Sequence, residues 1–157
     1  PRSRQSSLVA TMTSPLFHLA LPVDDLDAAA EFYGDCLQCP RGRSSEHWID
    51  YDFWGHQLVV HKVAPEAMPP VATNPVDGEQ VPASHFGVIL PWDAFDRLLA
   101  RLTSREIAFV IPPTTRFAGR RGEQRTLFVR DPAGNHLEFK TFRNPDMLFA
   151  TDGLDYP

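Results

Sequence analysis

The chain has 157 residues, of which 43% are hydrophobic, and its formal net charge is −5. This length fits one domain that can bury a core without help from disulfides or a structural metal. The net negative charge argues against a nucleic-acid partner, because the negative phosphates of nucleic acids bind positively charged surfaces. The sequence has no apolar run of the roughly 20 residues that a membrane-spanning helix needs, so we expect no membrane partner either.

Residues 1–13 are expected to be an N-terminal extension that lies outside a single domain of residues 14–150. The stretch PRSRQSSLVAT carries Arg2 and Arg4, several hydroxyl residues and no acid, which is typical of an expression tag or a transit-peptide remnant. Cys36 and Cys39 form one C-x-x-C pair, whereas a structural zinc site would need a second pair. We interpret them as structural thiols of a reducing compartment. A cytoplasmic protein is therefore expected, or an organellar one if the extension is a targeting remnant.

The first half of the domain, about residues 14–64, has the pattern of a strand, a helix and further strands. Residues 17–23 (FHLALPV) are typical of a buried strand, and Asp24 or Asp25 is expected to cap a helix whose apolar positions recur through Leu37. Residues 48–53 and 57–63 follow as two strands around a turn at Gly55. The proline-rich stretch 64–82 is expected to be a loop between the halves.

The second half, about residues 82–145, repeats this order. We expect strands at 85–90, 107–111, 126–130 and 136–142 and a helix at 91–103. His18 and His85 occupy the head of the first strand in each half, and GHQL at 55–58 corresponds to GNHL at 134–137. Such a duplication predicts an α+β fold of two β-α-β-β-β modules that form a curved eight-stranded mixed sheet around a metal site.

Three side chains are candidate metal ligands: His18, His85 and Glu138. Either histidine alone is more often a half-buried structural residue. Glu138 lies between two apolar residues of a strand, and a buried carboxylate is costly unless it is paired or binds a metal. If the modules bring these strands together, the three side chains form the two-histidine, one-carboxylate set that leaves positions open for substrate or oxygen. A polar cluster without a metal is the alternative.

Three segments, in order, carry a family resemblance over residues 15–150: FHLALPVDDLDAAAEFYGDCL, SHFGVIL and LFVRDPAGNHLEFKTF. On these segments the chain resembles the vicinal oxygen chelate superfamily, which includes glyoxalase I, extradiol dioxygenases, bleomycin-binding proteins and fosfomycin-resistance enzymes. The third segment contains the family's D-P-x-G-x-x-x-E signature, whose glutamate is a metal ligand and falls on Glu138. The family's two histidine ligands fall on His18 and His85. The runs GHQLVVHK and EFKTFRNPDMLFA are most similar to small extradiol-type dioxygenases.

The resemblance implies a homodimeric, non-heme Fe(II) extradiol-type dioxygenase that acts on a small aromatic or oxygenated substrate, anionic ones included. Mn, Ni or Zn would suit the same ligands. His56 or His61 would be the catalytic histidine beside the metal, and because they are five apart they face opposite sides of a regular strand. His61 also falls near the place where glyoxalase I has a fourth ligand. Two alternatives stay open: a glyoxalase-like isomerase or transferase that uses Ni, Zn or Mn, and a metal-free small-molecule binding protein.

The expected substrate contacts come from a basic segment and from aromatic residues. The segment RFAGRRGEQR (116–125) is either a solvated loop or a lid in which Arg116, Arg121 and Arg125 grip an anionic substrate. Phe128 stands where the ring-cleaving pattern has a tyrosine, so it removes a hydrogen-bond donor. Phe128 and Trp54 are expected to line the substrate pocket, although aromatic residues in such patterns are more often part of the core.

Overall fold

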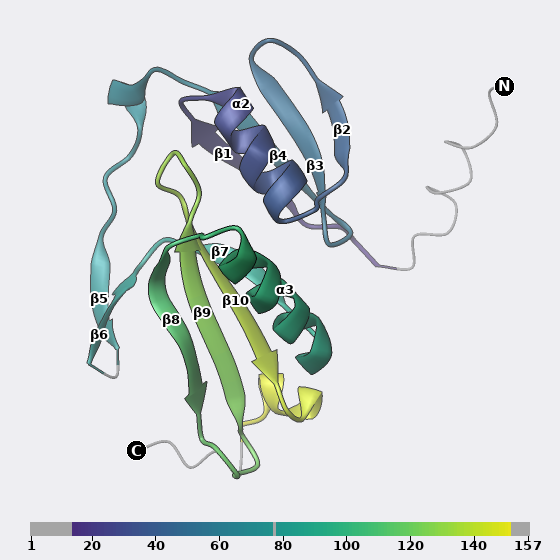
Figure 1. Cartoon of the computed structure of the whole chain (residues 1–157), viewed down its shortest axis with the longest axis vertical. Coiled ribbons are helices and arrows are strands. Elements are labelled where there is room, and N and C mark those ends of the chain that lie inside the picture. The colour runs from purple at the N-terminus through teal and green to yellow at the C-terminus, as the bar shows by residue number, and fades with distance from the viewer. Residues whose placement is uncertain (1–13, 77, 152–157) are drawn as a thin grey trace, which may run out of the picture.

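In the computed structural model, two similar modules follow each other along the chain (Figure 1). The structure describes residues 14–76 and 78–151, so the expected extension at 1–13 lies outside the described residues. No helix in these two described ranges is long and apolar enough to cross a membrane.

The first module consists of a strand, a helix and three strands: β1 (His18–Val23), α2 (Leu26–Ala29) with its continuation η1 (Ala30–Cys36), β2 (Arg41–Ser44), β3 (Trp48–Phe53) and β4 (His56–Lys62). Asp25 caps the helix as expected, because its carboxylate accepts hydrogen bonds from the amides of Asp27 and Ala28. From Ala30 the helix widens into π-helical turns. The sequence did not predict β2, since its residues RGRS are exposed and lack apolar alternation.

The second module has the same element order: β7 (Phe86–Ile89), α3 (Trp92–Ser104), β8 (Phe109–Arg116), β9 (Gln124–Arg130) and β10 (His136–Phe142), followed by the short helix η3 (Pro145–Phe149). The expected loop between the modules contains the short helix η2 (Pro65–Ala67) and a hairpin of β5 (Thr73–Val76) and β6 (Glu79–Pro82). The hairpin stands beside the second module in Figure 1.

Each module forms its own four-stranded mixed sheet, with the orders β1-β4-β3-β2 and β7-β10-β9-β8. The strand registers also correspond, because Leu19 pairs with Leu58 in the first sheet and Phe86 pairs with Leu137 in the second. The duplication predicted from the sequence is therefore present in the backbone. The expected single eight-stranded sheet is not: β1 and β7 are edge strands of two separate sheets.

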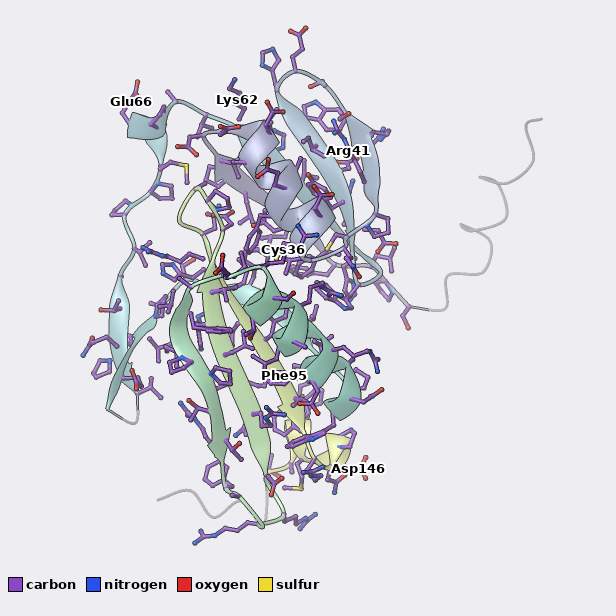
Figure 2. The ribbon with its side chains drawn as sticks, viewed as in Figure 1. Cys36, Arg41, Lys62, Glu66, Phe95 and Asp146 are labelled. Atoms are coloured by element: carbon purple, nitrogen blue, oxygen red, sulfur yellow. The ribbon has the colours of Figure 1, made fainter. Side chains whose placement is uncertain are left out.

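The two modules contact each other through hydrophobic side chains. One hydrophobic core contains residues of both modules, among them Tyr33, Phe53, Phe95 and Phe139; Phe95 points from α3 into it (Figure 2). The rings of Phe53 and Phe86 pack at 5.6 Å between centroids across this boundary. Both modules therefore depend on each other for a complete core.

A polar contact also crosses the boundary at the turn between β9 and β10. The hydroxyl of Tyr33 donates to the carboxylate of Asp131 at 2.8 Å, and both side chains are buried. Asp131 also accepts from the amide and the side chain of Asn135, whose Nδ2 donates to the carbonyl of Pro22 at 2.9 Å. Burial and the adjacent Asp131 raise the pKa of Tyr33 well above its usual value. The D-P-A-G turn is thus fastened to the first module.

Cys36 and Cys39 are both buried free thiols, 4% and 5% exposed. Burial raises the pKa of Cys36, and it raises that of Cys39 to about 12. Since the thiolate is the reactive form, neither sulfur is activated. A structural role remains our interpretation of the C-x-x-C pair.

Candidate metal centre

The alternation of β10 gives this strand one apolar face and one polar face. Leu137, Phe139 and Thr141 are fully buried beneath α3, and His136, Glu138 and Lys140 point to the opposite side. β10 lies between β7 and β9, so that Glu138 is paired with Gly87 on one side and Phe128 on the other. The polar face of the central strand therefore carries a carboxylate between two neighbouring strands.

His85 contacts Glu138 on this face. Its Nδ1 lies 2.7 Å from the carbonyl oxygen of Pro82, and its Nε2 lies 3.2 Å from Oε2 of Glu138. Because a carbonyl oxygen only accepts, Nδ1 carries a proton, and Nε2 is the ring nitrogen that faces the carboxylate. This is the orientation that a metal-binding histidine takes when a backbone carbonyl fixes its ring.

The other carboxylate oxygen of Glu138 is held by two donors. The buried hydroxyl of Thr126 donates to Oε1 at 2.5 Å, and the ammonium of Lys140 lies 3.3 Å from the same atom. The ring of Phe128 packs edge-on against that of His85, with centroids 5.0 Å apart. Thr126, Phe128 and Lys140 therefore fix the positions of the two candidate ligands.

His18 lies in the other module and does not join this pair. Its Nδ1 is 2.8 Å from Oε1 of Gln57, which is its neighbour on β4, and the side chain is exposed. Across residues 14–76 and 78–151, no three His, Cys, Asp or Glu side chains lie close enough together to hold a metal ion. Within one chain the structure thus brings together two of the three expected ligands.

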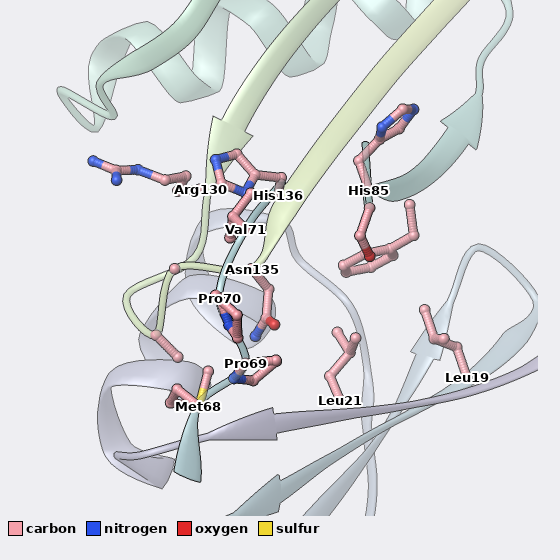
Figure 3. Close-up of a pocket in the computed structure, with 14 residues that line it drawn as sticks. Leu19, Leu21, Met68, Pro69, Pro70, Val71, His85, Arg130, Asn135 and His136 are labelled. Atoms are coloured by element: carbon pink, nitrogen blue, oxygen red, sulfur yellow. The ribbon is translucent and has the colours of Figure 1, made fainter. Parts of the chain in front are cut away.

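A pocket of about 390 Å³ lies beside His85, between the two modules (Figure 3). Leu19 and Leu21 of β1 form one wall, and His85, Arg130 and His136 form part of another. His136 has a buried Nδ1 without a hydrogen-bond partner. Its burial, and secondarily the positive charge of Arg130, lower the pKa of this histidine.

The two expected catalytic histidines lie in the first module, away from the His85–Glu138 pair. Nδ1 of His56 accepts a hydrogen bond from the amide of Phe17 at 3.0 Å. His61 lies opposite Pro22 on β1, four residues beyond the Gln57 that contacts His18, which places it roughly 13 Å along the strand. Neither histidine is brought next to His85 or Glu138 in one chain.

The expected substrate-binding residues are distributed over both faces of the second sheet. Phe128 lies at the site, whereas the guanidinium of Arg125 lies against α3, where it pairs with Asp96 and stacks near the ring of Phe95 at 4.8 Å. Trp54 packs against Phe139 on this same helix-covered side, with centroids 5.6 Å apart. Arg116 and the exposed Arg121 belong to the end of β8 and the following loop, at the opposite end of β9 from the D-P-A-G turn.

The model of the Glyoxalase/Bleomycin resistance protein/Dioxygenase superfamily matches residues 16–139, which is most of the chain. The chain belongs to this superfamily. Among solved structures, it is similar to a glyoxalase/bleomycin resistance protein/dioxygenase from Alicyclobacillus acidocaldarius, with 34% identity over 87% of this chain and 97% of that one and a TM-score of 0.68. A search of curated proteins gives no match.

Two more distant structures share the superfamily fold. A glyoxalase/dioxygenase from Nostoc punctiforme is 22% identical over 83% of this chain and 92% of its own, with a TM-score of 0.61. The fosfomycin resistance protein FosX from Listeria monocytogenes is 15% identical over 87% and 100%, with a TM-score of 0.64. At these identities the likeness shows the fold alone.

The sequence interpretation missed three residues that surround Glu138: His136, Lys140 and Thr126. His136 and Lys140 lie two residues before and after Glu138, so the alternation of a strand would have placed all three on one face. Thr126 pairs with Lys140 across the β9–β10 hairpin, and the turn at 131–134 would have given this register. The sequence therefore contained the information needed to find these residues, in their spacing from the signature glutamate Glu138.

Proposed function

We propose that this superfamily member is a metal-dependent enzyme whose site combines His85 and Glu138 of one chain with His18 of a second copy. The observation that carries the proposal is the contact between Nε2 of His85 and Oε2 of Glu138 at 3.2 Å. With Nδ1 donating to Pro82, Nε2 is the ring nitrogen that faces the carboxylate. A lone pair and a negative charge at this distance need a cation or a proton between them, and a divalent metal meets that need.

The ring of His18 is held in the same way as that of His85, by an oxygen atom next to Nδ1. Its Nδ1 is held by the side-chain oxygen of Gln57 at 2.8 Å, so that Nε2 is available as a ligand. It lies on edge strand β1, next to the exposed Leu16 and Phe17, which are 53% and 62% exposed. An apolar, unpaired edge is a surface for another chain. A symmetric dimer in which β1 of one copy meets β7 of the other would complete two identical sites.

Three ligands rather than four favour an open site. In the paired registers, Glu138 lies beside Gly87 and its counterpart in the first module, Val59, lies beside Ala20. Valine cannot replace the carboxylate that is the fourth ligand in glyoxalase I, and His61, the other candidate for that place, lies two residues further along β4. A two-histidine, one-carboxylate site keeps positions for other groups, as in non-heme Fe(II) oxygenases. This supports Fe(II) and an extradiol-type dioxygenase reaction over a glyoxalase-like isomerase.

When bound, the metal would supply a Lewis acid that holds two vicinal oxygens of a small substrate and gives access to dioxygen. The chain's own residues would position and shield this centre. Thr126 and Lys140 fix the Glu138 carboxylate, and the carbonyl of Pro82 fixes the ring of His85. Phe128 covers one edge of that ring and excludes water there, without contributing a donor.

The test is an anaerobic titration of the full chain with Fe(II), followed by oxygen-uptake assays with a panel of catechols. We expect one tightly bound Fe(II) per chain, with affinity reduced about 100-fold or more in His85→Ala, Glu138→Ala and His18→Ala. His47→Ala is the matched control, because this exposed histidine lies in the turn before β3.

Wild-type affinity in the three ligand variants would overturn the metal site. Tight metal binding together with an oxygen-independent reaction would favour the isomerase or transferase alternative. Absence of metal binding would favour a metal-free binding protein.

A further inference from the structure

Lys140 is placed on the polar face of β10 beside the metal-binding carboxylate. Its Nζ lies 3.3 Å from Oε1 of Glu138, and its side chain is 32% exposed. Its neighbours across the sheet are Thr126 on β9 and Ile89 on β7, neither of which carries a charge. The ammonium is therefore both tied to Glu138 and open to solvent at the site.

This position creates a charge imbalance once a metal is bound. Glu138 supplies one negative charge, and a divalent cation on its carboxylate would more than offset that charge. Lys140 would then lie within a few ångströms of a net positive centre, where like charges repel. A second anion next to both cations would relieve this repulsion.

We propose that Lys140 binds a negatively charged group of the substrate, so that the site selects anionic chelating molecules over neutral analogues. The inference deepens the proposed function and rests on its metal site. The substrate would place two oxygens on the metal and a carboxylate or a comparable anion against the ammonium. Such a charge-assisted hydrogen bond is short and about twice as strong as a neutral one.

Two arginines of the 116–125 segment, Arg121 and Arg125, are less suited to this role. Arg125 points to the opposite face of the sheet, where it pairs with Asp96 of α3. Arg121 is exposed in the loop between β8 and β9. This loop precedes the start of β9 at Gln124, four residues before Phe128, which is paired with Glu138. Lys140, by contrast, contacts the candidate metal ligand directly.

The test compares catechol with 2,3- and 3,4-dihydroxybenzoate, which add one carboxylate to the same chelating diol. Lys140→Gln removes the charge, Lys140→Arg keeps it, and Lys62→Gln is the control. Lys62 and Lys140 are the two lysines of the chain, and Lys62 lies at the outer end of the first module (Figure 2). For each protein, the Fe(II) affinity is measured first. Anaerobic binding of each catechol to the loaded protein is then followed by its absorption change.

We expect at least one dihydroxybenzoate to bind wild type more tightly than catechol does. This preference should fall about 10- to 100-fold in Lys140→Gln, persist in Lys62→Gln and be partly retained in Lys140→Arg. Because Lys140→Gln removes both a positive charge and one of the two donors that hold Glu138, catechol binding is compared at saturating Fe(II) for every protein. If wild type shows no preference for a carboxylated probe, or if Lys140→Gln keeps the preference, the role of Lys140 is overturned. Failure of wild type to bind Fe(II) would instead overturn the metal site itself.

Discussion

Gly87 lies so close to the backbone of Glu138 that a β-carbon at position 87 would overlap the carbonyl oxygen of Glu138. The two residues are paired partners on β7 and β10. Glycine is therefore required here by contact with a neighbouring strand. This close approach sets the distance between the strand that follows His85 and the strand that carries Glu138.

Gly87→Ala should separate these two strands and weaken both the fold and the site. We expect a loss of about 1–3 kcal/mol in the free energy of unfolding, as for other overpacked positions, and weaker Fe(II) binding. Denaturant unfolding and metal titration measure the two effects. Gly34→Ala is the control: the nearest atom to a new β-carbon there is 4.0 Å away, in ordinary contact. Wild-type stability and metal affinity in Gly87→Ala would contradict this account.

Two inactive chains should restore each other if the site is shared between copies. In a mixed dimer of His18→Ala and Glu138→Ala chains, one site has all three ligands and the other lacks two. Random assortment makes about half of the dimers mixed, so about one quarter of all sites should bind metal tightly. The measurement is the metal content after the variants are unfolded and refolded together. Each variant refolded alone is the control. No recovery in the mixture would contradict a shared site.

The burial of Tyr33 beside Asp131 should make stability sensitive to alkaline pH. Because the pKa of Tyr33 is raised in the folded state, its contribution is complete below about pH 10 and is lost as pH rises above that value, where unfolded tyrosine ionises. Tyr33→Phe should cost about 1–3 kcal/mol at neutral pH, because it leaves Asp131 short of a donor. Denaturant unfolding between about pH 7 and 11 measures both effects. The variant should lose stability less steeply above pH 10; an unchanged slope would contradict the assignment.

Arg125 should matter for stability and not for the site. It pairs with Asp96 and lies near the rings of Trp92 and Phe95, so Arg125→Gln should cost about 1–2 kcal/mol while metal and catechol binding stay unchanged. Arg97→Gln is the matched control, because its pair with Asp93 is exposed on α3 and should contribute little to stability. If Arg125→Gln lost binding of the carboxylated catechols, Arg125 would be a substrate-binding residue and this prediction would be wrong.

Much of the fold was predictable because local patterns determine it. The Asp25 cap, the alternation of β10 and the turn before it all follow from short-range chemistry, and the element order repeats in both halves. The relative placement of the modules was not predictable in this way. It depends on side-chain packing between distant residues, such as Phe53 against Phe86, which no periodicity reports.

The same limit applies to the candidate site. The spacing from the D-P-A-G turn identified Glu138, and the position at the head of a repeated strand identified His18 and His85. The sequence could not indicate whether β1 and β7 lie next to each other within one chain. In the structure they do not, because each is the edge strand of a separate sheet and is hydrogen-bonded to a neighbouring strand on one side only. Nor could the sequence indicate that Arg125 faces α3, since neighbouring residues of β9 are buried on both faces.

Asp131 is the first residue of the superfamily signature in this chain. Its carboxylate accepts hydrogen bonds from Tyr33 and Asn135. Its carboxylate holds the modules together and takes no part in the proposed chemistry. The aspartate and the glutamate of the signature therefore have separate tasks in this chain: Asp131 fastens the second module to the first, and Glu138, seven residues later, lies at the candidate metal centre. Loss of Glu138 alone would leave the docking of the two modules in place.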